Sequence, residues 1–249
     1  MRAAEAPGAL LWRPTTTNRK TGNIPTAIVH PDRIEESCEG CPQAPEAGGG
    51  CYARTGTVSF SLKATARAAA RRPQAYTVGH ALSGRLVSAR YARVTSIGDA
   101  GGLPQEEVEP QLEAVRAAGL HPIAYTSRWK RAPWLQRWAM ASTYSARGYR
   151  SAVARGWRAT LVVPAGVVAD HVEHGTPLPE LGAVLCPSQV GELTGEATTC
   201  NECGLCSVSK DPDGPGVLFA EHGPRVSRAW KRRVEAARER LLAALVGER

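Results

Sequence analysis

Seven cysteines are the residues of this chain best suited to chemistry, and four of them lie in its last third. Cys200, Cys203 and Cys206 form a C-x2-C-x2-C triplet, and Cys186, followed directly by a proline, precedes it. Three thiols at this spacing can curl round one centre where the loop winds tightly, and Gly204 permits such winding. A fourth thiolate from Cys186 would complete the ligand set. These four cysteines therefore predict a metal centre.

The identity of that centre depends on how the ligands are divided along the chain. A triplet joined by a distant Cys-Pro is similar to the cysteine ligation of ferredoxins, although in ferredoxins the Cys-Pro normally follows the triplet. Zinc ribbons usually present two separated C-x2-C pairs, and a triplet plus a lone cysteine is less typical of them. We predict a [4Fe-4S] cluster on Cys186, Cys200, Cys203 and Cys206, with structural zinc as the alternative and free thiols as the third possibility.

A second group of cysteines lies near the N-terminus. Cys38 and Cys41 form a C-x2-C pair followed by a proline, and Cys51 comes ten residues later, after a glycine-rich span. Three thiolates would leave one coordination position open for water, substrate or a cofactor. The spacing is not the C-x3-C-x2-C loop of radical S-adenosylmethionine enzymes. Two alternatives are a zinc site completed by His or Asp and a site that shares a ligand with the C-terminal group.

Other candidate residues carry weaker signals. Asp99 follows a strand-like segment inside the sequence Gly-Asp-Ala-Gly-Gly and is either a site acid or ligand, or a turn residue. His171 and His174 form an H-x2-H pair, for which a surface position is the simpler interpretation. The sequence contains no phosphate-binding P-loop, no G-x-G-x-x-G and no G-x-S-x-G. The catalytic residues are therefore not defined, and Asp99, Thr126 and Ser127 are the candidates.

Composition narrows the class of protein. The 249 residues are 43% hydrophobic, which is enough for a full core and excludes intrinsic disorder as the main state. No apolar run is long enough to span a membrane, and the first residues lack the apolar core of a secretory signal. We therefore expect a cytoplasmic protein with reduced thiols and no disulfide framework. The formal net charge of +8 suits a nucleic-acid partner, but it rests on scattered arginines that suggest a GC-rich genome.

The elements that must position these residues alternate between strand-like and helical segments. We expect one α/β domain over residues 1–249, with an irregular arm at 1–30 and cysteine-rich segments at 36–52 and 186–206. The order favours a (β/α) barrel, such as an incomplete TIM-type barrel, with a doubly wound sheet as the alternative. The expected strands are 27–29, 91–97, 121–126, 139–143, 160–163, 183–186 and 216–220. The expected helices include 61–72, 106–118, a stretch with Trp134, Leu135 and Trp138, 149–155 and an amphipathic helix at 227–246.

Polar residues that follow the strands are expected to face the site, because ligands bind at the carboxyl ends of parallel strands. These residues are Asp99, Thr126, Ser127, Ser142 and Tyr144. In the helix at 106–118, Pro110 is tolerable only in the first turn.

Several short blocks together resemble the phage "gene product 88" family. They are the segment 18–25 (NRKTGNIP), the three N-terminal cysteines with Tyr52-Ala53, Ile97-Gly98-Asp99, Tyr125-Thr126-Ser127, the Cys186-Pro187 and triplet pattern, and the segment 217–223 (VLFAEHG). The resemblance covers residues 18 to 223. It implies a bacteriophage or prophage origin in a bacterial host, and a fold like the barrels of radical enzymes with Asp99, Thr126 and Ser127 at the mouth.

Two functions follow from the sequence. The first is a phage iron-sulfur protein whose three-cysteine site carries redox or radical-type chemistry. The alternative is a nucleic-acid-binding module with a structural zinc or iron-sulfur site. Whether the protein is an enzyme, and on which substrate, is left open.

Overall fold

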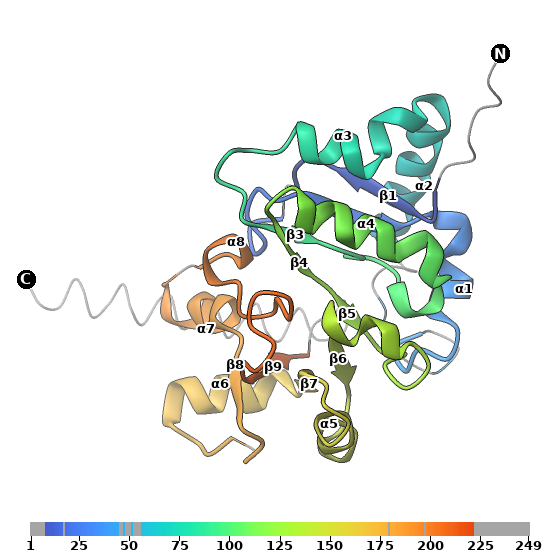
Figure 1. Cartoon of the computed structure of the whole chain (residues 1–249). Coiled ribbons are helices and arrows are strands. Elements are labelled where there is room, and N and C mark those ends of the chain that lie inside the picture. The colour runs from blue at the N-terminus through green and yellow to red at the C-terminus, as the bar shows by residue number, and fades with distance from the viewer. Residues whose placement is uncertain are drawn as a thin grey trace, which may run out of the picture.

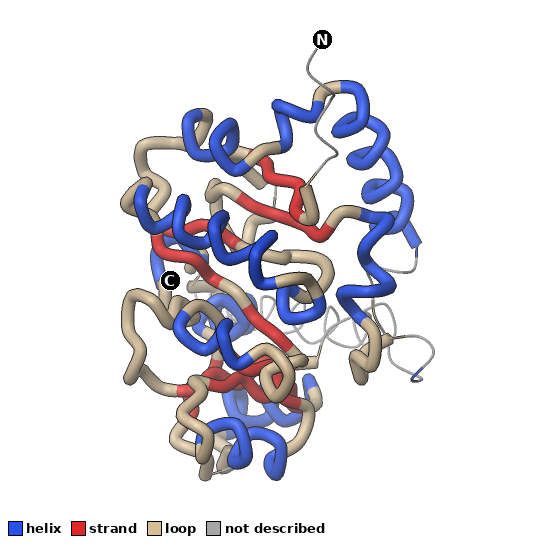
Figure 2. Tube along the Cα trace, turned by 45° about the vertical axis from the view of Figure 1, so that its right-hand side comes forward, coloured by secondary structure: helices blue, strands red, loops and turns tan. Residues whose placement is uncertain are grey.

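The computed structural model describes residues 8–16, 18–44, 47, 51, 56–178, 180–196 and 198–221. These residues form a mixed α/β structure in which mainly parallel strands lie in the middle and helices lie on the outside (Figure 2). The α/β class predicted from the alternation of strands and helices is confirmed. In this part of the chain, no helix is both long and apolar enough to cross a membrane.

The first sheet has the order β1-β2-β3-β4. Its strands are β1 (Leu10–Arg13), β2 (Thr26–Val29), β3 (Tyr91–Arg93) and β4 (His121–Ile123). The β1–β2 pair is antiparallel, whereas β2–β3 and β3–β4 are parallel. Parallel neighbours need a crossover connection, and the long segments 30–90 and 94–120 supply it with helices.

The second sheet is entirely parallel and has the order β5-β6-β7-β9-β8. Its strands are β5 (Tyr125–Thr126), β6 (Met140–Thr143), β7 (Ala159–Val163), β8 (Ala183–Leu185) and β9 (Gly216–Ala220). Only Ala124 separates β4 from β5, so the chain passes directly from one sheet to the other. The described strands do not close on themselves, with β1 and β8 as the outer edges, so a closed TIM-type barrel is not formed.

Helices cover the sheets, as Figure 1 shows for α3 and α4 beside the first sheet and α5 and α6 beside the second. The α-helices are α1 (Ile34–Cys38), α2 (Gly56–Arg71), α3 (Val78–Ser83), α4 (Gln105–Ala117), α5 (Ala146–Val153), α6 (Ala165–His174), α7 (Pro187–Thr194) and α8 (Cys200–Cys203). Short 3-10 helices are η1 (Pro31–Arg33), η4 (Pro73–Tyr76), η5 (Ala100–Gly102) and η6 (Pro133–Arg137).

The two faces of the strands differ in burial. Ala92, Ala141 and Leu218 are fully buried on the face that packs against the helices, as the alternation of side chains along a strand requires. Arg93 and Tyr125 are only half-buried on the opposite face. The rest of this second face is buried, because Ile123 and Met140 share it with Arg93 and Tyr125, so its accessible part is limited.

Three sequence expectations need correction. The segment 1–30 is not an irregular arm, because Leu10, Leu11 and Trp12 are buried in β1 and pair with β2. Pro110 does not lie in the first turn, because α4 begins at Gln105 and continues through it. The helix predicted around Trp134 is the 3-10 helix η6. The amphipathic helix predicted at 227–246 lies outside the described residues.

Candidate metal sites

The four C-terminal cysteines come from two elements and the loop after one of them. Cys186 is the residue immediately before α7, directly after β8. Cys200 and Cys203 lie on α8, whose start is fixed by a capping box between Thr199 and Glu202. Cys206 follows the helix on a loop. Folding therefore brings the end of a strand and a single helical turn to the same place.

Gly204 shapes the turn between Cys203 and Cys206. It ends α8 in the left-handed conformation with a φ of 64°, which glycine adopts at no steric cost. A Cβ atom at this position would also overlap the ring of Tyr91. The predicted tight winding at Gly204 is confirmed, and it depends on packing against β3 as well as on backbone conformation.

The four cysteines line one small pocket. Its other lining residues are Ile123, Pro187, Ser188, Thr199, Gly204 and Leu205, and its exposed lining is almost entirely apolar. Cys206 is buried, and the other three thiols are half-buried. The four residues predicted to be ligands are therefore brought together, although they are spread over 21 positions of the sequence.

Burial dominates the electrostatics of this pocket. It raises the pKa of Cys186 and Cys200, and it raises the pKa of Cys206 to about 12. Three groups oppose the shift: backbone N–H groups at the start of α7 act on Cys186, Arg93 on Cys200, and the Tyr125 hydroxyl on Cys206. These groups favour the thiolate, which is the form that binds metals.

The segment that carries the triplet bridges the two sheets. On one side, the N–H of Cys200 donates to the Lys20 carbonyl at 2.9 Å, and the Arg90 guanidinium donates to the carbonyls of Asn201 and Glu202. On the other side, the buried Arg158, which precedes β7, donates to four carbonyls of the same segment: Leu205, Ser207, Asp211 and Pro215. Figure 1 shows α8 beside the start of β3 and α7 beside β8.

The donor set fits a metal centre in composition, with one restriction on its arrangement. Four thiols share an otherwise apolar pocket, and three of them have a nearby group that favours the thiolate. Over the described residues, however, no three His, Cys, Asp or Glu side chains converge on a point that a single ion could occupy.

The three N-terminal cysteines lie on α1 and the turn after it. Cys38 is the last residue of α1, the N–H of Cys41 donates to its carbonyl at 2.9 Å, and the N–H of Cys51 donates to the carbonyl of Gln43 at 3.0 Å. Electrostatic coupling to Cys41 and Cys51 contributes to the raised pKa of Cys38. The structure therefore places the three thiols near one another, in a group that we call the three-cysteine site.

Asp99, Ser127 and Tyr144 lie beside the three-cysteine site. Burial raises the pKa of Cys41, and Asp99 adds to this shift, whereas the backbone N–H of Gln43 and the Ser127 hydroxyl oppose it. The pKa of Tyr144 is raised by burial and by Cys41, Asp99, Cys51 and Cys38. Asp99 and Ser127, two candidates from the strand ends, therefore lie beside the thiols together with Tyr144. Tyr144 directly follows β6.

The Asp99 carboxylate already has partners within the chain. It accepts hydrogen bonds from the N–H of Gly101 at 2.8 Å and from the N–H and hydroxyl of Ser127, both at 2.7 Å. Thr126, the third candidate, is buried, and its hydroxyl accepts the N–H of Arg128. Asp99 therefore holds the Ser127 loop in place while lying next to the thiols, and Thr126 has a local structural contact.

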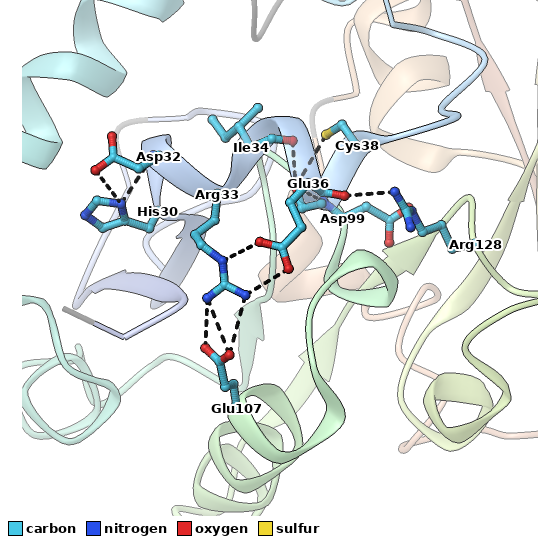
Figure 3. Close-up of polar contacts among 10 residues, drawn as sticks. His30, Asp32, Arg33, Ile34, Glu36, Cys38, Asp99, Glu107 and Arg128 are labelled. Carbon is cyan, nitrogen blue, oxygen red and sulfur yellow. Dashed lines mark hydrogen bonds and ion pairs between the residues drawn. The ribbon is translucent and has the colours of Figure 1, made fainter. Parts of the chain in front are cut away.

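Two arginines hold α1 in this position through hydrogen bonds and ion pairs. Arg128 donates to the carbonyl of Glu36 at 2.8 Å (Figure 3) and to that of Glu39 at 2.6 Å, at the end of the helix that carries Cys38. Arg33 pairs with Glu36 on the same helix and with Glu107 of α4. Ser37 is fully buried, and its hydroxyl lies 3.5 Å from the Cys38 sulfur. No feature of the sequence predicts these contacts.

The Gly-Asp-Ala-Gly-Gly segment is a packing device rather than a phosphate loop. A Cβ atom at Gly102 would overlap the backbone of Ser37, and one at Gly101 would overlap the Thr126 side chain. Gly98 has a φ of 86° and packs on Val29. These glycines let η5 touch α1 and β5, which is how Asp99 reaches both Ser127 and the thiols.

Two further observations complete the comparison with the sequence. His171 and His174 lie on α6, where the Nδ1 of His171 contacts the Thr176 carbonyl, so the simpler surface interpretation fits. Thr95, two residues after β3, has a φ of 50°, a conformation that is costly for a β-branched residue. It is buried, and its hydroxyl has no hydrogen-bond partner among the described residues. Backbone strain of this kind leaves no trace in the sequence.

The chain was compared with protein-family models, with curated proteins and with solved structures, and none of the three comparisons produced a match.

Proposed function

We propose that this chain is an iron-sulfur protein in which Cys186, Cys200, Cys203 and Cys206 hold a [4Fe-4S] cluster. The observation that carries the proposal is that these four thiols, and no other ionisable side chains, line one small apolar pocket. In such a cluster each thiolate binds a different iron, so the four sulfurs do not have to converge on one point. Tetrahedral zinc requires that convergence, with Zn–S distances of about 2.3 Å.

The surrounding residues fit this assignment. When bound, a [4Fe-4S] cluster supplies one-electron redox chemistry at a potential set by hydrogen bonds, burial and charge. Here the chain would supply Arg93, the Tyr125 hydroxyl and the N–H groups at the start of α7 as the groups that stabilise the thiolates. Ile123 and Leu205 would exclude water from the sulfurs.

The three-cysteine site is proposed as a second metal site with an open position. This segment supplies three thiols rather than four. The Asp99 carboxylate beside it already accepts hydrogen bonds from Ser127. Ser127 and Tyr144, which lie beside the thiols, would supply the hydroxyls that orient a bound molecule. Redox or radical-type chemistry would take place here rather than at the four-cysteine pocket.

The proposed function also implies a family, a location and a barrel-like fold for this chain. We place the chain in the phage "gene product 88" family, in the cytoplasm of a bacterial host, on the strength of the motif blocks quoted above. We also infer that the two sheets are parts of an incomplete barrel, because β4 and β5 follow one another with a single residue between them. The triplet segment would occupy the opening between the sheets.

Anaerobic purification tests the proposal. We expect a brown protein with visible absorption that bleaches on exposure to air or dithionite, and we expect Cys203→Ser to lose most of this absorption. A colourless wild-type protein carrying stoichiometric zinc would overturn it.

A further inference from the structure

One long stretch of this chain contains basic residues and no acidic ones. Residues 48–98 contain eight Lys and Arg and no Asp or Glu, which equals the whole formal net charge of +8. Three of these arginines serve the fold: Arg85 and Arg90 donate to backbone carbonyls, and Arg93 lies over the Tyr125 ring at 5.2 Å. The others that the structure describes, Lys63, Arg67, Arg71 and Arg72, are exposed.

These four residues lie on or directly after α2. Lys63, Arg67 and Arg71 are spaced four residues apart, so they form one line along the helix with about 6 Å between neighbours. Within the described part of the chain, none of the four has an ion-pair partner. Like charges placed this close repel one another unless an anion lies between them.

The line of charges continues into an open pocket of about 480 Å³ between α2, η4 and the end of β1. Arg13, Arg71, Arg72 and Tyr76 line it, with no acidic residue among its lining residues. Phe60, which is 74% exposed, lies on the same face of α2 as Arg67 and Arg71, according to the 100° rotation per residue. The surface therefore combines guanidinium groups with one exposed aromatic ring, Phe60, and one half-buried ring, Tyr76.

We propose that this surface, consisting of Phe60, Lys63, Arg67, Arg71 and Arg72 with Arg13 in the pocket, binds the phosphate backbone of a nucleic acid. Arginine forks match phosphate oxygens, and aromatic rings can stack on bases without sequence preference. An anionic membrane is the less suitable partner. The apolar side of α2, with Leu62 and Ala69, is buried in the fold, so Phe60 is the main apolar group that α2 exposes.

The test is fluorescence anisotropy with labelled single-stranded and duplex DNA of about 20 nucleotides, longer than a typical single-strand site, titrated over a range of salt concentrations. The variant is R67Q/R71Q, because Gln maintains helix propensity. The matched control is R147Q/R150Q on α5, which removes the same charge from exposed positions elsewhere.

We expect wild-type binding that weakens as salt rises. In R67Q/R71Q we expect roughly tenfold weaker binding and a salt slope smaller by about two, since each lost phosphate contact removes about one. The control pair should change the slope little. The proposal is overturned if neither DNA binds at low salt, if both variants lose affinity equally, or if phosphatidylserine vesicles bind and DNA does not.

Discussion

The seven thiols form two groups whose members influence the pKa of others in the same group. Cys186, Cys200 and Cys203 contribute to the raised pKa of Cys206, whereas Cys41 and Cys51 contribute to that of Cys38. If the groups bind metal separately, removing one thiol affects only its own group. The choice of residue to substitute therefore tests the division into four and three.

Cys203→Ser is expected to remove most of the iron bound at the four-cysteine pocket, because a serine oxygen replaces a thiolate ligand. Cys51→Ser is the matched control and should leave that iron in place. Iron and sulfide per chain, measured after anaerobic purification, checks both variants. Equal loss of iron in the two variants would contradict the division.

Arg158 is the buried side chain that holds the triplet segment against the second sheet. Its guanidinium is buried and donates to four carbonyls, at 2.6 to 3.4 Å. Arg158→Met would leave these carbonyls without a charged donor and should cost about 3 kcal/mol of unfolding free energy. Urea unfolding followed by circular dichroism measures the loss. Arg150→Met, at an exposed position, should lie within about 0.5 kcal/mol of wild type, and similar losses in both would disprove the role of Arg158.

At the scale of elements, the contact between η5 and α1 positions the three-cysteine site. Gly102 packs on the backbone of Ser37, one residue before Cys38. Gly102→Ala should displace α1, destabilise the protein by about 2 kcal/mol and reduce metal binding at the three-cysteine site. Thermal unfolding of Gly102→Ala measures the loss of stability. Metal analysis of Gly102→Ala in the Cys203→Ser background measures the metal bound at the three-cysteine site.

Gly79→Ala serves as the comparison for that variant. Gly79 lies within α3 with open space around it, so a methyl group there should stabilise the protein by about 0.5–1 kcal/mol. A stable Gly102→Ala protein with unchanged metal binding would show that this contact does not position the thiols.

The sequence predicted the elements well where a short apolar run stood between clear turn signals. The strand 216–220 has the predicted bounds, and those around 140–143 and 159–163 differ by one residue. β1 was missed because Leu10–Trp12 is too short to distinguish from a loop beside prolines, and only pairing with β2 makes it a strand. Pro110 is accommodated because tertiary packing of Val108 and Leu112 outweighs its helix-breaking tendency.

The candidate sites could likewise be predicted only in part. Spacing was enough to group the cysteines, because ligands near one another in sequence must lie near one another in space. Spacing alone could not show that Ser127 is hydrogen-bonded to Asp99 whereas its neighbour Thr126 is buried. Adjacent residues along a strand point to opposite faces, and the sequence does not say which face carries the site. Arg90, Arg128 and Arg158 were missed because their partners are distant backbone carbonyls.

At the scale of the whole molecule, the triplet segment joins sheets that have no strand pairing with each other. It contacts the loop before β2 through Lys20 and Thr21, and it contacts the second sheet through Arg158. A metal centre held by Cys186 and the triplet would reinforce this junction, because metal binding contributes directly to folding free energy.

Removing the metal should therefore destabilise the junction between the sheets more than it destabilises the sheets themselves. Hydrogen exchange measured by mass spectrometry on loaded and metal-free protein should show faster exchange at 198–211, where the N–H groups of Cys200 and Asn201 bond to the loop at 18–22. The amides of β7 and β9 should change little. Uniform loss of protection across both sheets would indicate that the metal stabilises the fold globally instead.

The most direct test of the central claim is the iron and acid-labile sulfide content of anaerobically purified protein, with a Mössbauer spectrum to identify the iron. A [4Fe-4S] cluster on Cys186, Cys200, Cys203 and Cys206 predicts about four irons and four sulfides at this pocket, lost in Cys203→Ser and retained in Cys51→Ser. Stoichiometric zinc without sulfide, or iron and sulfide contents that are the same in Cys203→Ser as in the wild type, would contradict it.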